Sequence, residues 1–173
     1  MFGLLKKRRN SKVLKKNTVS SPSEGISYDD NLIETFQDEH QTLLKLFGII
    51  KSAAEQKDFK LVQVKLKQFT SILRGHLLTE NVKLYVYLSK ELANDPENKE
   101  IIMSFRREMM QIGKVVNQFV TAYSKPVWST DMREYFLPEF LDIGEVLVER
   151  IEREENTLYP LYLPKDHYSY YIL

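Results

Sequence analysis

The segment from residue 32 to residue 50 reads LIETFQDEHQTLLKLFGII, and its spacing decides the fold. Six residues recur at alternating intervals of three and four: Ile33, Phe36, His40, Leu43, Phe47 and Ile50. This interval places all six on one face of an α-helix, so the segment is predicted to be an amphipathic helix with a single buried stripe. A histidine, His40, lies within that stripe.

Three further segments show the same helical spacing. Between Lys57-Asp58 and Asn94-Asp95-Pro96 the inward residues are Phe69, Leu73, His76, Glu80, Leu84 and Tyr87. Between Pro96 and Lys125-Pro126 they are Phe105, Met109, Ile112, Val116, Phe119 and Tyr123. In the last segment, entered near Pro138 and ended by Pro160, they are Phe140, Ile143, Leu147, Arg150, Glu154 and Leu158. Prolines at these boundaries are typical helix breakers.

The four predicted helices define the fold class. No segment alternates apolar and polar residues with period two, so a sheet is not expected. Short connections favour antiparallel neighbours, and the sequence predicts an all-α, antiparallel up-and-down four-helix bundle over residues 28–173, with an aromatic C-terminal tail. Residues 1–27 are predicted to be a basic, disordered tail. Trp128, the one tryptophan, is predicted to cap an end of the bundle.

The composition restricts the function classes. The 173 residues are enough for one domain, and the absence of cysteine excludes disulfides, thiolate metal sites and cysteine nucleophiles. No apolar run approaches the roughly 20 residues of a membrane span, so a cytoplasmic protein is expected. A glycine-rich phosphate loop, a GxSxG motif and a Ser/His nucleophile pair are all missing. We therefore predict that the protein is not an enzyme, and we identify no small-molecule substrate.

The net charge of +1 is the sum of two unlike parts. Of the 25 Lys and Arg residues, seven lie in residues 1–24, where only Glu24 opposes them. The other 18 face 24 acidic residues in all, so the body together with Glu24 carries about −6. The basic tail is either a solvated extension or a contact for an anionic membrane or nucleic acid.

Polar residues interrupt the predicted core at matching levels. The inward set is His40, His76, Glu80 and Glu154, with Glu108 or Glu155 expected nearby. Helical bundles build metal sites from histidines and glutamates that project inward from facing helices. One interpretation is therefore a site that holds a metal ion, non-haem iron being the candidate cofactor.

Two other inward residues lead to a second interpretation. Met109 is a poor iron ligand, and Arg150 is a permanent cation, which is costly beside a metal ion. If Arg150 lies between Glu80 and Glu154, its guanidinium supplies the positive charge that a metal would otherwise supply. In this interpretation Arg150 and Met109 form a core network that replaces the metal, and no cofactor is bound.

Three motifs resemble a known family. Asp38-Glu39-His40, His76-Leu77-Leu78-Thr79-Glu80 and Glu154-Glu155-Asn156-Thr157-Leu158-Tyr159-Pro160 are similar to the hemerythrin-type HHE cation-binding domain. The resemblance implies a four-helix bundle whose histidines and carboxylates bind a pair of non-haem irons. Arg150 and Met109 stand where the family's pattern has histidines.

A second resemblance concerns the fourth predicted helix. Asp142-Ile143-Gly144-Glu145, followed by Leu147, Arg150, Glu154 and Leu158, is similar to the Rsd/AlgQ regulators of the RNA polymerase sigma-70 factor. This resemblance implies a cytoplasmic regulator that binds a protein partner, a sigma-70-type factor. An acidic body suits a basic partner, because complementary charge speeds encounter. We take this regulator as the first hypothesis, and a hemerythrin-like iron protein acting in oxygen, redox or iron sensing as the alternative.

Overall fold

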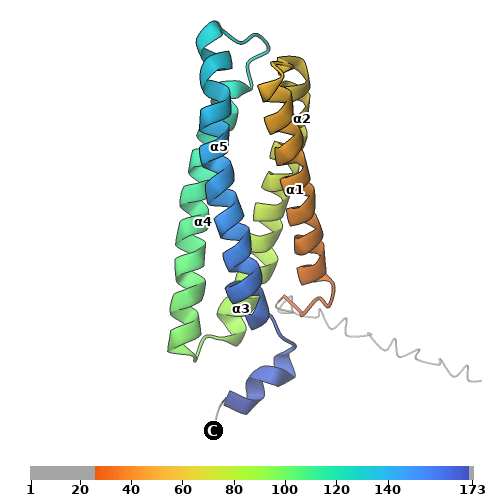
Figure 1. Ribbon diagram of the computed structural model, residues 1–173. Helices are drawn as coiled ribbons and strands as arrows, with labels where there is room; N and C mark the ends of the chain where they lie inside the picture. The colour runs from red at the N-terminus through yellow and green to blue at the C-terminus, as the bar shows by residue number, and fades with distance from the viewer. Residues whose placement is uncertain (1–25, 172–173) are drawn as a thin grey trace, which may run out of the picture.

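The computed structural model describes residues 26–171, which form a long bundle of helices lying side by side (Figure 1). The first half of the chain consists of α1 (Leu32–Glu55), α2 (Phe59–Thr79), the π-helical turn η1 (Glu80–Leu84) and α3 (Tyr85–Glu91). The second half consists of α4 (Pro96–Tyr123), α5 (Thr130–Arg153), the π-helical turn η2 (Glu154–Leu158), and the 3₁₀ turns η3 (Tyr159–Leu161) and η4 (Lys165–Tyr171).

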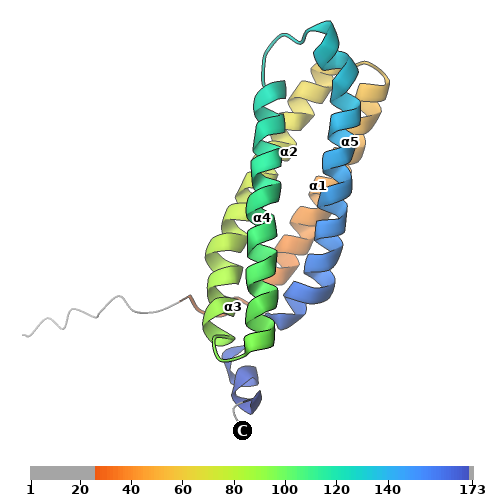
Figure 2. The same cartoon turned by 90° about the vertical axis from the view of Figure 1, so that its left-hand side faces the viewer.

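The helices run alternately up and down. α1 packs against α2 and α5, while α4 packs against α2, α3 and α5, so the four rods form a closed square (Figures 1 and 2). Residues 26–171 contain no strand. The prediction of an all-α, antiparallel up-and-down four-helix bundle is confirmed.

Three helices begin at side chains that satisfy free backbone N–H groups. Asp58 accepts a hydrogen bond from the Leu61 N–H at 3.1 Å, and Asp95 accepts one from the Asn98 N–H at 3.1 Å. Ser129 does the same for the Met132 N–H at 3.2 Å at the start of α5. Such N-caps fix where each helix starts, because the first turn has no partners of its own.

The prediction that the fourth helix is entered near Pro138 is wrong. α5 begins at Thr130, and Pro138 lies inside the helix. The early turns form because Phe136 is fully buried against Trp128, with ring centroids 4.9 Å apart. This packing outweighs the backbone hydrogen bond that a proline cannot make. Trp128 is buried at the α4–α5 connection, and its indole N–H donates to the Tyr123 carbonyl at 3.1 Å.

The core consists of two apolar clusters with a polar layer between them. On α1 the layer lies between Phe36 of one cluster and Leu43 of the other. The same change of cluster occurs within α4, from α2 to η1, and from α5 to η2. The buried polar side chains of this layer are His40, His76, Glu80, Arg150 and Glu154. The fold thus brings together the inward polar residues of all its long helices except α4, which contributes Met109 at this level.

The N-terminal tail falls almost wholly outside the described residues. Its predicted contacts with an anionic membrane or nucleic acid concern residues 1–25 and stay a prediction. At the other end, Tyr168 is buried, and its hydroxyl donates to the Leu161 carbonyl, so the aromatic segment packs on the end of the bundle. Within the described chain no helix is long and apolar enough to cross a membrane.

Candidate metal centre

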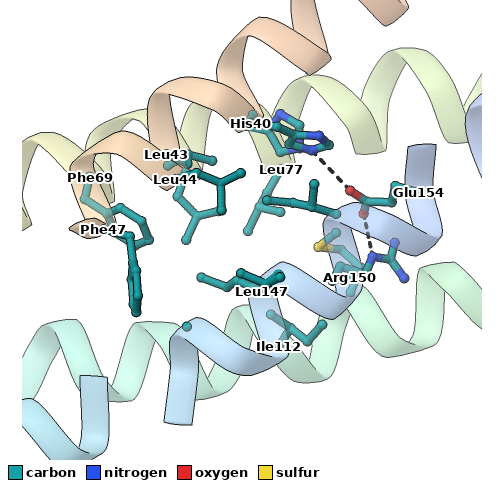
Figure 3. A pocket seen from close by; sticks show the side chains of 16 residues that line it. His40, Leu43, Leu44, Phe47, Phe69, Leu77, Ile112, Leu147, Arg150 and Glu154 are labelled. Carbon is teal, nitrogen blue, oxygen red and sulfur yellow. Dashed lines mark hydrogen bonds and ion pairs between the residues drawn. The ribbon is translucent and has the colours of Figure 1, made fainter. Parts of the chain in front are cut away.

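Three potential ligands meet in the polar layer. His40 of α1, His76 of α2 and Glu154 of η2 each offer an atom, and these atoms lie within 4.8 Å of one another. None of the three side chains is more than 3% exposed. Figure 3 shows His40 and Glu154 directed at each other from facing helices.

The two imidazoles face each other through the same ring atom. The Nε2 atoms of His40 and His76 are 3.2 Å apart. On the far side of each ring, Nδ1 lies 2.8 Å from a carboxylate oxygen, Glu155 for His40 and Glu39 for His76. Because a carboxylate accepts hydrogen bonds, each Nδ1 is assigned as the N–H donor.

This arrangement leaves two lone pairs directed at one point. With its proton on Nδ1, a neutral imidazole carries a bare Nε2, and two bare nitrogens cannot hydrogen-bond to each other. An electropositive group therefore has to face them: a proton, a metal cation, or for His40 the Tyr159 hydroxyl, which lies 3.3 Å from its Nε2. Carboxylates that hold Nδ1–H are also what fixes and strengthens histidine as a metal ligand.

Two buried carboxylates complete the layer. Glu154 places Oε2 at 3.3 Å from the His40 Nε2, whereas Glu80 is fully buried and neither of its oxygens has a hydrogen-bond partner. Burial, reinforced by the negative charge of Glu154, raises the pKa of Glu80 well above its usual value. A buried carboxylate without partners is costly, and a cation in the layer would relieve that cost.

In the metal-free layer the pKa values of the two histidines are shifted in opposite directions. Burial opposes the charge on His40, but the hydrogen bonds that the ring donates to Glu154 and Glu155 outweigh it and raise its pKa above 6.5. Burial lowers the pKa of His76 despite the hydrogen bond to Glu39, and a charged His40 lowers it further. One proton is therefore favoured on the pair, and it sits on His40, where a metal ion would replace it.

Both glutamates open π-helical turns. η1 starts at Glu80 and η2 starts at Glu154, and each turn interrupts an otherwise regular helix. π-turns are rare and are frequent at functional sites. The two turns lie at the polar layer, η1 after α2 and η2 after α5, and each places its glutamate side chain in the core.

Arg150 neutralises the other side of Glu154. Its Nε donates to the Glu154 Oε1 at 2.5 Å, which is one turn away along the chain. Its other nitrogens donate to Glu108 at 2.7 Å, to the Tyr85 hydroxyl at 2.6 Å and to the Phe105 carbonyl at 3.2 Å. Although burial raises the pKa of Glu154 by itself, the hydrogen bonds from His40 and the charge of Arg150 outweigh it, so this pKa is lowered.

The predicted pairing of Arg150 with both Glu80 and Glu154 is wrong in one half. Arg150 pairs with Glu154, but Glu80 has no hydrogen-bond partner. Four of the five guanidinium N–H groups donate to Glu154, Glu108, Tyr85 and Phe105, and none donates to Glu80. The metal-replacing network therefore leaves one buried carboxylate unsatisfied.

The remaining predicted site residues lie around the cluster rather than in it. Glu155 binds the Nδ1 of His40 from outside. Glu108 is half-buried and pairs with Arg150 and Arg153. Met109 is buried and lines the cavity next to the site.

Sequence reasoning missed two neighbours of the histidines. Glu39 precedes His40 but pairs with His76, so its adjacency in sequence gave no indication of its partner. The Tyr159 hydroxyl lies 3.3 Å from the His40 Nε2, and its ring stacks on the imidazole at 5.8 Å. Tyr159 lies in the segment 154–160, from which sequence reasoning selected only Glu154 and Glu155 as site residues.

An apolar cavity adjoins the cluster. It measures about 30 Å³, and its walls include Leu43, Phe47, Leu73 and Leu147 together with the histidines (Figure 3). A single water needs about 10–15 Å³, so the space accommodates one or two water-sized molecules. The candidate site therefore has room beside it that is not filled by side chains.

A buried pair of carboxylate-held histidines with two further carboxylates defines a candidate cation site in a four-helix bundle. The family model for the Hemerythrin HHE cation binding domain matches residues 31–162, which is most of the chain. The chain belongs to this family. No curated protein and no solved structure matches the chain, and nothing in these comparisons supports the resemblance to the Rsd/AlgQ regulators.

Proposed function

We propose that the protein binds non-haem iron in its polar layer and acts as an iron-dependent sensor of oxygen, redox state or iron itself. The observation that carries the proposal is the pair of Nε2 atoms 3.2 Å apart, each on a ring whose Nδ1 is held by a carboxylate. Two histidines turned in this way leave both lone pairs directed at one point, which fits a cation.

The donor set supports iron rather than a harder or softer metal. His40, His76 and Glu154 would hold the ion, with Glu80 as a fourth ligand from η1. Two imidazoles with carboxylate are typical of non-haem Fe(II), whereas Mg²⁺ and Ca²⁺ prefer oxygen alone and soft metals prefer sulfur. Bound iron would supply one-electron chemistry beside the cavity.

This chain's own residues would prepare the site. Glu39 and Glu155 orient the rings and hold a proton on each Nδ1, so that Nε2 is the atom of each ring that would bind the ion. The apolar walls keep bulk water out, which strengthens each charge interaction inside. Tyr159 places a hydroxyl against the His40 ring edge and can donate a hydrogen bond into the layer.

The experiment is a metal titration of the full chain. Apo protein is mixed anaerobically with Fe(II), excess metal is removed, and bound iron is measured by elemental analysis. His40→Ala and His76→Ala are expected to lose bound iron because each removes a ligand. His167→Ala is the matched control, since His167 is exposed in η4, far along the chain from the layer.

The outcomes separate clearly. Iron retained by the control and lost by both core variants supports the proposal. Iron absent from the wild-type protein, or bound equally well by all four proteins, would overturn it.

A second proposal concerns a protein partner, and a surface feature favours it. An apolar groove of about 260 Å³ lies between α4 and α5, and it includes the exposed Val115 and Val146. Asp142, from the segment similar to the sigma-70 regulators, lines the same groove. With a body charge of about −6, the favoured occupant is a basic surface, and we propose the DNA-binding domain of a sigma-70-type factor.

Titration against that domain at low and high salt tests this second proposal. Binding in the micromolar range or tighter that weakens as salt rises, and that Val146→Asp abolishes, supports it. Lack of binding at both salt concentrations would contradict it.

A further inference from the structure

We infer that the centre takes one metal ion, because the Arg150 guanidinium is a permanent cation in the place that a second ion would need. The inference rests on the proposed iron binding and goes further: it fixes the number of ions and the residue that sets it.

Glu154 divides the polar layer into two cation positions. Its Oε2 faces the imidazole pair, 3.3 Å from the His40 Nε2, and its Oε1 accepts from the Arg150 Nε at 2.5 Å. Figure 3 shows both contacts as a line from His40 through Glu154 to Arg150. One carboxylate therefore joins a position with free nitrogen ligands to a position already filled by a guanidinium.

The oxygen atoms that contact Arg150 are not free to bind a second ion. They belong to the Glu108 carboxylate, the Tyr85 hydroxyl and the Phe105 carbonyl, and each accepts a hydrogen bond from the guanidinium. The unpartnered carboxylate of the layer, Glu80, is assigned to the ion held by the histidines. The other oxygen of Glu108 accepts from Arg153 at 2.5 Å. The remaining contact from α4 at this level is apolar, because the guanidinium lies over the Phe105 ring at 4.5 Å and Met109 lines the cavity.

The buried charges point the same way. Glu80 and Glu154 contribute up to two negative charges inside the bundle, and Arg150 contributes one positive charge that cannot be removed. With Glu80 and Glu154 ionised and Arg150 charged, one divalent ion between the histidines would bring the buried total to +1, whereas a second would bring it to +3. A second would sit against a fixed cation in a low-dielectric interior, where repulsion between like charges is strong.

A centre with one ion has a functional consequence. The charge of a single iron would change by one electron at a time. Arg150 would experience that change through Glu154, which contacts both His40 and Arg150. Besides Glu154 of η2, Arg150 contacts Tyr85 of α3 and Glu108 of α4, so it would link the state of the ion to two further elements.

The first test is the number of ions in the wild-type full chain. Titration with Mn(II), followed by dialysis and elemental analysis, is expected to end at one ion per chain. The electron paramagnetic resonance spectrum is expected to show an isolated Mn(II) ion. Two ions per chain, or the spectrum of an exchange-coupled pair, would overturn the inference, whereas no bound ion at all would overturn the proposed iron function instead.

The second test changes the guanidinium. Arg150→His with Met109→His removes the cation and places imidazoles in the second position, and it is expected to raise the end point to two ions. Arg153→Met is the matched control, because Arg153 contacts the same Glu108 and the same Phe105 ring but is 40% exposed.

The control is expected to stay at one ion. A folded double variant that still binds one ion, or a control that binds two, would show that Arg150 does not set the number. Circular dichroism reports folding, and if the double variant does not fold, the wild-type end point and spectrum decide alone.

Discussion

Glu80 and Arg150 both lie in the polar layer, but they differ in how many hydrogen-bond partners they have. Arg150 donates to four oxygen atoms, while both oxygens of Glu80 are buried without a partner. Burial raises the pKa of Glu80 well above its usual value, and the charge of Glu154 adds to the effect. Without a metal, Glu80 therefore makes the free energy of unfolding depend on pH.

The sign of that dependence follows from proton binding. Above pH 4.5 the unfolded chain releases the Glu80 proton, but the folded chain keeps it until the raised pKa is passed. The folded state binds more protons in this window, so rising pH lowers the free energy of unfolding. Below the unfolded pKa the two states hold the same proton and the effect disappears.

Glu80→Gln removes this slope. In the presence of a chelator, the stability of the variant relative to wild type is expected to rise from pH 5 to pH 7, by up to about 1.4 kcal/mol per pH unit inside the window. Urea unfolding at both pH values measures it. A buried amide adds a cost of its own, but that cost is the same at both pH values, so parallel behaviour of the two proteins would contradict the prediction.

Individual inward residues could be predicted from spacing, but their partners could not. Helical periodicity placed His40, His76, Glu80, Arg150 and Glu154 in the core, and all five are buried. Periodicity says which way a side chain faces on its own helix and nothing about the rotation of the next helix. For that reason the pairing of Glu39 with His76, and the isolation of Glu80, emerged only from the packed structure.

At the scale of elements, the contact between α1 and α5 depends on a missing side chain. A Cβ atom at Gly144 would lie 2.1 Å from the Phe47 ring. Phe47 in turn stacks on Phe140 with ring centroids 4.6 Å apart and lines the cavity beside the histidines. The glycine therefore allows one aromatic ring to fill the interface next to the site.

Gly144→Ala is expected to destabilise the bundle relative to Gly113→Ala. The new methyl forces the Phe47 ring away from its stack, and overpacking of this kind costs about 1–3 kcal/mol. At Gly113 of α4 a Cβ meets nothing within 4 Å, so alanine is expected to stabilise that helix by about 0.5–1 kcal/mol. Thermal unfolding of the two variants measures the difference, and equal stability would show that Phe47 yields without cost.

The same scale shows why element boundaries were harder to predict than elements. Pro138 was a reasonable sign of a helix start, yet burial of Phe136 against Trp128 extends α5 back to Thr130. The π-turns at Glu80 and Glu154 were not predicted either, because the four-residue steps that precede them suit an ordinary helix equally well. Tertiary packing decides both features, and a single sequence does not display it.

For the molecule as a whole, the polar layer is a joint between two apolar clusters. Its candidate ligands His40, His76 and Glu154 come from α1, α2 and η2, so a bound ion would connect segments far apart in the chain. An ion that binds only the folded state stabilises that state by mass action. Metal binding should therefore be visible as global stability and not only as local order.

The last prediction follows from this linkage. At free Mn(II) one hundred times the dissociation constant, the free energy of unfolding is expected to rise by about 2.7 kcal/mol, and a chelator should reverse the gain.

Glu155→Gln keeps every proposed ligand but weakens the hold on the His40 Nδ1, and partners of this kind change metal affinity by about 10–100-fold. Glu155→Gln should thus reach the same free energy of unfolding only at about 10–100 times the Mn(II) concentration. Glu80→Gln loses a proposed ligand, so its free energy of unfolding should rise less at the same Mn(II) concentration. Denaturant unfolding across a Mn(II) series measures all three proteins. Identical curves with metal and with chelator for the wild type would mean that the ion, if bound, does not join the helices, and the joint between the clusters would then depend on Arg150 and its oxygen partners alone.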